Sequence, residues 1–404
     1  KPSKMNRYLM LLILFLNGIT NIKAQNNLTI LSDIGLENLA EIYELDHYYL
    51  SYENNRFRYE GDALVAVIEA LIIPQKAKKV TLLIQNRGIG ISSISFTLEN
   101  FSALKEGTLS SKMFAEKAKF SFNVDDLITK FDEREKINSS YYKAEAIVGL
   151  DVEYALGNFD NGVRQKINFQ PELFSVLGKG AVISGRYNFP TFNEIDNETS
   201  FLQLARITQD IRWKDNVFLN LNLGFSTQNR YGLNTRLDRY LGSEKLRLRF
   251  DFGVTKELYL DQNVDLVIKN NINTFNMSGG IIYRWNRFDT DFSFRYGSFL
   301  IGDTGFKASM RRQFDEVFVG LFLNSTSFGK IAGFDFRVPL SPKRHMKNKG
   351  VRIRTKDYFS LDYNYRYDSD IALEAFNGSS VLDQIEEYFP AVLQKKLGKH
   401  LFRK

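Results

Sequence analysis

The stretch from Lys245 to Val254 reads KLRLRFDFGV and alternates strictly between two kinds of side chain. One set is apolar, and the positions between carry mostly charge: the first set is Leu246, Leu248, Phe250, Phe252 and Val254, the second Lys245, Arg247, Arg249, Asp251 and Gly253. Successive side chains of a strand point to opposite faces, so we predict a strand with one apolar and one charged face. In a water-soluble sandwich the apolar face forms the core, whereas in an outer-membrane β-barrel it meets lipid and the charged face lines the lumen.

The same alternation recurs along the second half of the chain. It is clearest in VFLNLNLGFS (Val217–Ser226), RFDTDFSFRYGSF (Arg287–Phe299) and VFVGLFLNST (Val317–Thr326). Short segments of this kind separated by turns predict about 12 antiparallel strands, within a range of about 10 to 14, over residues 144–367. Because almost every segment keeps polar residues on one parity, no second apolar layer is available for a sandwich. We therefore predict a mainly β protein built on an antiparallel transmembrane outer-membrane β-barrel.

The composition agrees with a barrel and argues against several other classes. Aromatic residues make up 14% of the chain, with 34 Phe and 20 Tyr, and barrels place aromatics in girdles at both membrane interfaces. The net charge of +7 is not concentrated in one module, so we expect no nucleic-acid binding. The sequence has no cysteine, and its three histidines, His47, His345 and His400, lie far apart. We therefore expect no enzyme activity, no cofactor and no metal site.

The first residues have the form of a secretory signal peptide. Arg7 supplies positive charge, Leu9 to Leu16 form an apolar run, and a cleavage site is expected after Ala24. The run is too short to span a bilayer as a helix, which takes about 20 residues. We predict a signal peptide over residues 1–24 with Met5 as the start, and a single membrane anchor remains the alternative.

Residues 27–105 predict a small periplasmic α/β domain, and residues 106–143 a connector. A strand in HYYLSYENNRFR (His47–Arg58) precedes a helix over Gly61–Ile73, for which Asp62 is the expected N-cap and Pro74 the stop. Two further strands are expected at Lys79–Gln85 and Ile91–Leu98. RGIGISS (Arg87–Ser93) lacks the glycine spacing of a phosphate-binding loop, so we expect a turn there.

The charged parity of the predicted strands supplies the candidate site residues. The expected lumen-lining residues are Arg247, Arg249, Asp251, Arg284, Asp289, Asp291, Arg295, Arg311 and Asp335. One interpretation is a water-filled interior in which these charges pair with one another. The other is a mixed-charge track for an anionic or polyhydroxylated polymer, on whose sugar rings Tyr231, Tyr240, Tyr283 and Tyr296 could stack if they face inward. Charge reversal of Arg247 and Arg249 would then reduce polymer export.

The end of the chain carries a basic segment followed by a tail. The segment over residues 341–354 offers six cations for anionic headgroups or polymer, with a solvated periplasmic loop as the alternative: Lys343, Arg344, Lys347, Lys349, Arg352 and Arg354. A last strand is expected at Tyr358–Tyr367. Residues 368–404 predict a helical tail in the periplasm, in which Pro390 kinks or splits a helix over Val381–Leu397.

Three stretches resemble the YjbH/GfcD-type proteins of exopolysaccharide and group 4 capsule export. They are HYYLSYENNRFRYEGDALVAVI, RYGSFLIGDTGFKASMRRQF and GFDFRVPLSPKRH, in which the family's recurring motifs fall on Tyr52–Arg58, Arg295–Gly305 and Pro339–Arg344. The resemblance implies an outer-membrane barrel with a periplasmic α/β domain. It also implies a polysaccharide export protein and periplasmic accessory proteins as partners. Many relatives are lipoproteins and some are long enough for two barrels, whereas this chain has no cysteine and room for one barrel.

We therefore expect a non-catalytic outer-membrane β-barrel, in contact with lipid and polysaccharide, that takes part in export or assembly of exopolysaccharide as a conduit or a scaffold. The alternative is a general diffusion porin, or a structural barrel subunit of a secretion or motility machine. The polysaccharide, the state of the lumen and the number of copies are left open by the sequence.

Overall fold

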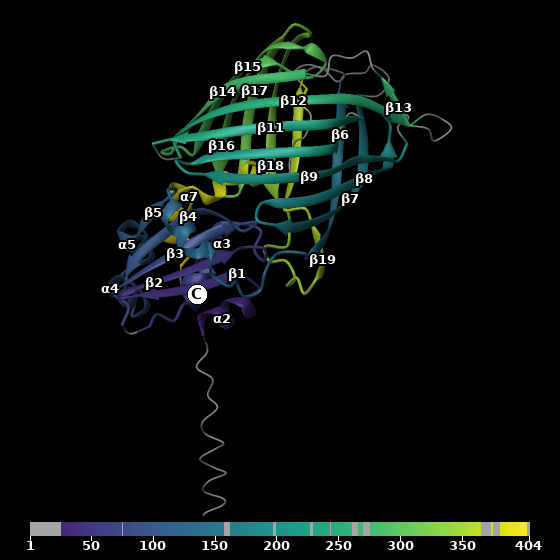
Figure 1. The fold of residues 1–404 in the computed structure, drawn as a ribbon. Coiled ribbons are helices and arrows are strands. Elements are labelled where there is room, and N and C mark those ends of the chain that lie inside the picture. Colours follow the sequence, from purple (N-terminus) through teal and green to yellow (C-terminus); the bar gives the residue numbers. More distant parts are fainter. Residues whose placement is uncertain are drawn as a thin grey trace, which may run out of the picture.

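The computed structural model describes residues 26–74, 76–156, 162–196, 199–226, 229–242, 244–260, 266–269, 275–364, 373–374 and 380–401. The predicted signal peptide over residues 1–24 lies outside this described part. The protein is mainly β, with 57% strand and 19% helix, as predicted. Its strands form a five-stranded and a fifteen-stranded sheet, and Figure 1 shows the smaller sheet and its helices at one end of the larger one.

The smaller sheet and its helices form what we call the α/β unit. Its strands lie in chain order, antiparallel except for the parallel pair β2 and β3: β1 (Glu37–Glu44), β2 (His47–Glu53), β3 (Lys79–Asn86), β4 (Ile89–Thr97) and β5 (Lys119–Ser121). Its helices are α2 (Asn27–Ile34), α3 (Glu60–Ala70), α4 (Leu98–Lys105), α5 (Ser111–Lys117) and α6 (Asp125–Asp132).

Two local features of the α/β unit differ from the sequence-based expectation, and a third agrees with it. Residues 106–143, expected as a connector, contribute α5, α6 and β5, which pairs with β4. The helix α3 begins at Glu60 after Tyr59 as N-cap, so Asp62 lies in the first turn, where it favours the helix dipole. The turn expected in Arg87–Ser93 is confirmed, because Arg87 and Gly88 join β3 to β4 with φ of 53° and 73°.

In the larger sheet, most strands pair antiparallel with the strand that follows them in the chain. Its strands are β6 (Ala144–Leu156), β7 (Val163–Gly178), β8 (Ala181–Asn193), β9 (Phe201–Trp213), β10 (Val217–Ser226), β11 (Arg230–Leu241), β12 (Leu246–Leu260), β13 (Leu266–Lys269), β14 (Phe275–Trp285), β15 (Thr290–Ser298), β16 (Thr304–Phe314), β17 (Val317–Thr326), β18 (Gly329–Pro339), β19 (Val351–Thr355) and β20 (Tyr358–Asn364). The short strand β13 pairs with β12 beside the main path.

A single stretch of chain lies against both ends of this antiparallel series. β19 pairs with β6 in parallel, and β20 pairs with β18 antiparallel. Lys356 and Asp357, which separate β19 from β20, continue the two pairings: the Lys356 N–H donates to the Val148 carbonyl at 3.0 Å, and the Asp357 carbonyl accepts from the Leu340 N–H at 2.9 Å. The hydrogen-bonded strand order nevertheless runs from β19 to β20 and is not a closed ring. Val351 to Arg354 of β19 belong to the basic segment over residues 341–354, so the end of that segment is a strand and not a solvated loop.

The two faces of the larger sheet have reversed burial. In β12, Leu248 and Phe250 are 39% and 43% exposed, whereas Arg247, which precedes Leu248, is 8% exposed. Phe294 of β15 and Leu321 of β17 are more than half exposed in the same way. The alternation predicted for Lys245–Val254 is therefore confirmed, and its charged side is the buried one.

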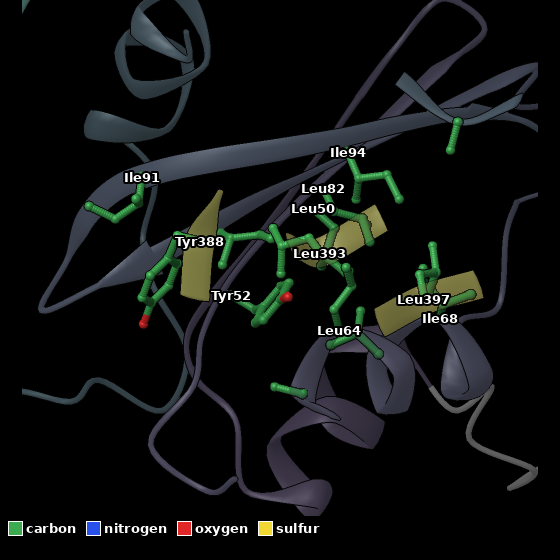
Figure 2. Packing of buried hydrophobic residues seen from close by; sticks show 14 of the residues in the cluster. Leu50, Tyr52, Leu64, Ile68, Leu82, Ile91, Ile94, Tyr388, Leu393 and Leu397 are labelled. Carbon is green, nitrogen blue, oxygen red and sulfur yellow. The ribbon is translucent and has the colours of Figure 1, made fainter. Parts of the chain in front are cut away.

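The C-terminal residues complete the α/β unit. They form two short 3-10 helices, η2 (Val381–Asp383) and η3 (Ile385–Tyr388), and the helix α7 (Pro390–His400). Pro390 is the first residue of α7, where its missing N–H costs no hydrogen bond, so the predicted helix is divided there. Figure 2 shows Leu393 and Leu397 beside Leu64 and Ile68 of α3 in the apolar core of the unit. Among the described residues, no helix has the length and apolarity needed to cross a membrane.

Candidate functional site

The charged face of the larger sheet, which we call the inner face, is covered by a segment from the C-terminus. We define this C-terminal strap as residues 373–374 and 380–389. Glu374 forms ion pairs with Arg295 and with Lys307, the latter at 2.6 Å. Asp383 lies 3.0 Å from Arg236, in the middle of β11, and Glu386 lies 4.0 Å from Arg247, at the start of β12. The contacts of the strap thus run along the inner face toward the α/β unit.

Asp238 is the centre of the charge network under the strap. Its side chain is fully buried, and it accepts hydrogen bonds from Arg236 and Arg249 at 3.0 and 3.1 Å. Arg247 lies 3.7 Å from the same carboxylate and donates to the Tyr240 hydroxyl at 3.0 Å. A buried carboxylate shared by several guanidinium groups is stable only as a set, because removal of one partner leaves uncompensated buried charge.

All nine residues predicted for the charged face form ion pairs. Four of them lie together near the strap: Arg247, Arg249, Asp251 and Arg295. The other five form separate groups: Arg284 with Asp291 at 2.9 Å and Asp289 at 3.7 Å, and Arg311 with Asp335 at 3.0 Å. Asp289 also pairs with Lys395 of α7. These contacts agree with the interpretation in which the inner-face charges pair with one another.

Sequence reasoning missed the residues that organise this network. Arg236 and Asp238 stand on one parity of β11 with Asn234 and Tyr240, so the alternation of that strand was a usable signal. The carboxylates of the strap had no comparable signal, because their segment has no strand period and pairs with residues far away in the chain.

The aromatic and basic candidates are divided between structural roles and exposed positions. Of the four tyrosines considered for sugar stacking, Tyr283 and Tyr296 are 47% and 60% exposed on the apolar face, and Tyr231 is half-buried on the same parity of β11 as Leu233. Tyr240 faces inward but is enclosed by other rings, from Phe122, Phe218 and Phe389. In the basic segment four cations are exposed: Lys343, Arg344, Lys347 and Lys349. The remaining two, Arg352 and Arg354, pair with Glu145 of β6.

Two polar cavities flank the strap, and Ser380 and Asp383 line both of them. The smaller, about 50 Å³, is rich in amides and guanidinium groups; among its lining residues are Asn220, Asn222, Asn234, Asn276, Arg249 and Arg295. The larger, about 400 Å³, lies on the side of β6, β7, β8 and β20; its lining includes Asp151, Glu172, Arg186, Arg337 and Lys356. The strap therefore separates two spaces along the inner face. The smaller is large enough for water, and the larger is large enough for a ligand.

Buried carboxyl groups hold the strap to the α/β unit. The Glu387 carboxylate accepts from the Tyr358 hydroxyl at 2.8 Å and from the Glu60 N–H at 3.3 Å. Burial raises the pKa of Glu387 to about 8, although the bond from Tyr358 acts in the other direction. Burial likewise raises the pKa of Glu60, which accepts from the Tyr52 hydroxyl at 2.9 Å, well above its ordinary value. Both raised pKa values favour the neutral form of these acids, because an ionised carboxylate would lose its hydration there.

Arginine side chains also join the two units directly. Arg212 of β9 donates to the carbonyls of Ile91 and Phe122 at 2.9 and 2.8 Å. Arg58, just before α3, donates through Nε to Glu316 between β16 and β17 at 3.0 Å. These buried contacts fix the end of the inner face against the α/β unit.

In the part of the chain that the structure describes, no group of three or more potential metal-ligating side chains comes together. No family model and no curated protein matches this chain.

Proposed function

We propose that this protein is a non-catalytic outer-membrane β-barrel that takes part in export or assembly of exopolysaccharide at the cell surface. The larger sheet would span the membrane, with the α/β unit and α7 in the periplasm. The observation that carries the proposal is the reversed burial of the sheet. In water, a protein is destabilised when rows of large apolar side chains are exposed over a buried charge network. In lipid, the same arrangement is favourable.

The distribution of exposed aromatics supports a membrane position. The two tryptophans, Trp213 and Trp285, are 51% and 45% exposed at strand ends next to the α/β unit, where Asp215 and Asp289 contact α6 and α7. Phe275, at the start of β14, and Phe328, in the turn between β17 and β18, are exposed at the opposite end of the sheet. Aromatic side chains at both ends of membrane strands are typical of the two lipid–water interfaces.

The position of residues 351–364 supports a barrel. A free strand edge in lipid leaves backbone N–H and C=O groups without partners, at several kcal/mol each. Here β19 and β20 cover the outer edges of β6 and β18. We propose that this stretch of chain is the seam of the barrel.

The export role rests on the resemblance to YjbH/GfcD-type proteins and on the charged, amide-rich inner face. In this role the α/β unit is the docking surface for a polysaccharide export protein and periplasmic accessory proteins. The strap covers the inner face, so a conduit requires the strap to leave, whereas a scaffold does not.

A deletion strain complemented with the intact gene tests the export role. We expect polysaccharide to be lost from the surface and retained in the periplasm of the deletion strain, and complementation to restore it. Unchanged polysaccharide in both places would overturn the proposal and favour a diffusion porin or a structural subunit of another machine. A steady conductance of the purified protein in planar bilayers would favour the porin.

A locked strap separates conduit from scaffold. The Ser380 hydroxyl lies 2.7 Å from the Asp210 carboxylate, so the double variant D210C/S380C places two thiols close together in a chain without other cysteines. If the protein is a conduit, the oxidised variant fails to restore surface polysaccharide and the reduced variant restores it. Equal export by the oxidised and reduced forms would establish the scaffold role. The reduced form is the matched control for loss of Asp210.

A further inference from the structure

The strap neutralises a surplus of positive charge on the inner face. Within the described residues, five cations form the network around it: Arg236, Arg247, Arg249, Arg295 and Lys307. The wall carboxylates that pair with them are Asp238 and Asp251. The strap adds Glu374, Asp383 and Glu386, which brings the carboxylates of the network to the number of its cations.

The balance has a consequence for any state in which the carboxylates of the strap have left the wall. The wall of β11, β12, β15 and β16 would then hold three cations more than it holds carboxylates. Their side chains are largely buried, so the surplus charge is poorly hydrated and needs other anions. The neighbouring pairs Arg284–Asp291 and Arg311–Asp335 are neutral by themselves and contribute no surplus.

We propose that the carboxylates of the strap occupy the places that the acidic groups of the protein's ligand take, so that the ligand is an anionic, hydroxyl-rich polymer that competes with the strap. This inference rests on the proposed export function and names its substrate class. Arginine binds a carboxylate of a ligand through the same paired N–H groups that it offers to a glutamate or aspartate.

The surroundings of the strap fit a saccharide rather than a simple polyanion. Amide side chains line the smaller cavity between the strap and the wall: Asn220, Asn222, Asn234 and Asn276. An amide offers both donors and an acceptor, and so does each sugar hydroxyl, whereas a polyanion without hydroxyls uses only the donors. The larger cavity of about 400 Å³ on the other side of the strap provides space in which a ligand can approach before the strap moves.

Apolar packing keeps the exchange reversible. Val381, Leu382 and Ile385 are buried in the core shared with the α/β unit, and α7 continues that core. The strap therefore stays attached to the protein when its carboxylates leave the wall, and it can return when the ligand has passed.

The rate of thiol labelling in an S380C variant tests the proposal. Ser380, at the start of the 380–389 part of the strap, is buried against Asp210 of β9, so maleimide labelling of the full-length protein in detergent reports release of this end of the strap from the wall. We expect an oligogalacturonate to accelerate labelling at least tenfold at constant ionic strength, and a dextran oligomer of the same length to leave the rate unchanged. Polyglutamate, which has charge without sugar hydroxyls, should accelerate labelling less than the oligogalacturonate does.

Matched variants of neighbouring inner-face cations localise the effect. K307Q should lose most of the response to oligogalacturonate and K307R should keep it, whereas R311Q, on the same strand but paired with Asp335, should respond as the parent does. Charge reversal of Arg247 and Arg249 is unsuitable, because both side chains contact the buried Asp238.

Equal acceleration by dextran and oligogalacturonate, or no acceleration by either, would overturn the acidic-polymer inference. Those results would leave the deletion-strain test of export untouched, so the two failures can be told apart.

Discussion

The α/β unit and the larger sheet sort the same kinds of side chain in opposite ways. In the unit, Leu50, Leu82 and Ile94 are completely buried. In the sheet, Phe294 and Leu321 are more than half exposed, while Asp238 is completely buried. The hydrophobic effect removes apolar area from water, so the opposite arrangements are the basis of our proposal that the two units face different surroundings. If the larger sheet spans a membrane as we propose, the boundary between those surroundings lies at the strand ends marked by Trp213 and Trp285.

Substitution of Asp238 should have the largest effect on stability, and it tests whether the buried charge network stabilises the larger sheet. D238N leaves the guanidinium groups of Arg236 and Arg249 buried without their carboxylate, and we expect a loss of about 3–5 kcal/mol of unfolding free energy. The matched variant D335N removes the partner of the half-exposed Arg311 and should cost no more than about 1 kcal/mol. Urea unfolding in detergent micelles measures both. Equal losses would show that the inner network is no more than surface charge.

A charge on the exposed apolar face should have the next largest effect. F250R is expected to cost about 2–4 kcal/mol in lipid vesicles, because an arginine near the bilayer midplane loses its hydration. M113R places the same residue on a similarly exposed position of α5, where a change within about 0.5 kcal/mol is expected. Reversible unfolding from vesicles compares the two variants. A neutral F250R would mean that this face meets water.

The buried acids make the junction between the two units sensitive to pH. Glu387 is contacted by Tyr358 and the Glu60 N–H, with Arg337 and Asp357 nearby. Because its pKa is raised from 4.5 to about 8, the folded state holds a proton that the unfolded segment releases, so docking weakens as the pH rises from about 5 to 8 and levels off above. Glu60 acts in the same direction.

Amide hydrogen exchange of α7, corrected for intrinsic rates, measures this dependence. We expect the protection of α7 to fall by up to about tenfold per pH unit between pH 6 and 8, and E387Q to flatten much of that slope. An identical slope in E387Q would assign the pH dependence to other groups.

Local patterns predicted the strands better than they predicted what covers them. The bounds expected for Val217–Ser226 and Val317–Thr326 are those of β10 and β17, because alternation is a property of each strand alone. β19 was not predicted, because it lies mostly in a basic segment and its pairing with β6 joins residues far apart in the chain. The strap was missed for the same reason: the pairs of Glu374 with Arg295 and of Asp383 with Arg236 are set by the path of the chain and leave no period in the sequence.

The most direct test of the membrane position of the sheet is quenching of single tryptophans by lipids brominated in the middle of their chains. In a W213F/W285F background, F250W reports the exposed apolar face and Y240W reports the inner face. After reconstitution into vesicles, we expect strong quenching of F250W and little quenching of Y240W. Fluorescence of F250W that is unaffected by brominated lipid, or equal quenching at both positions, would contradict a lipid-facing apolar surface over a charged interior.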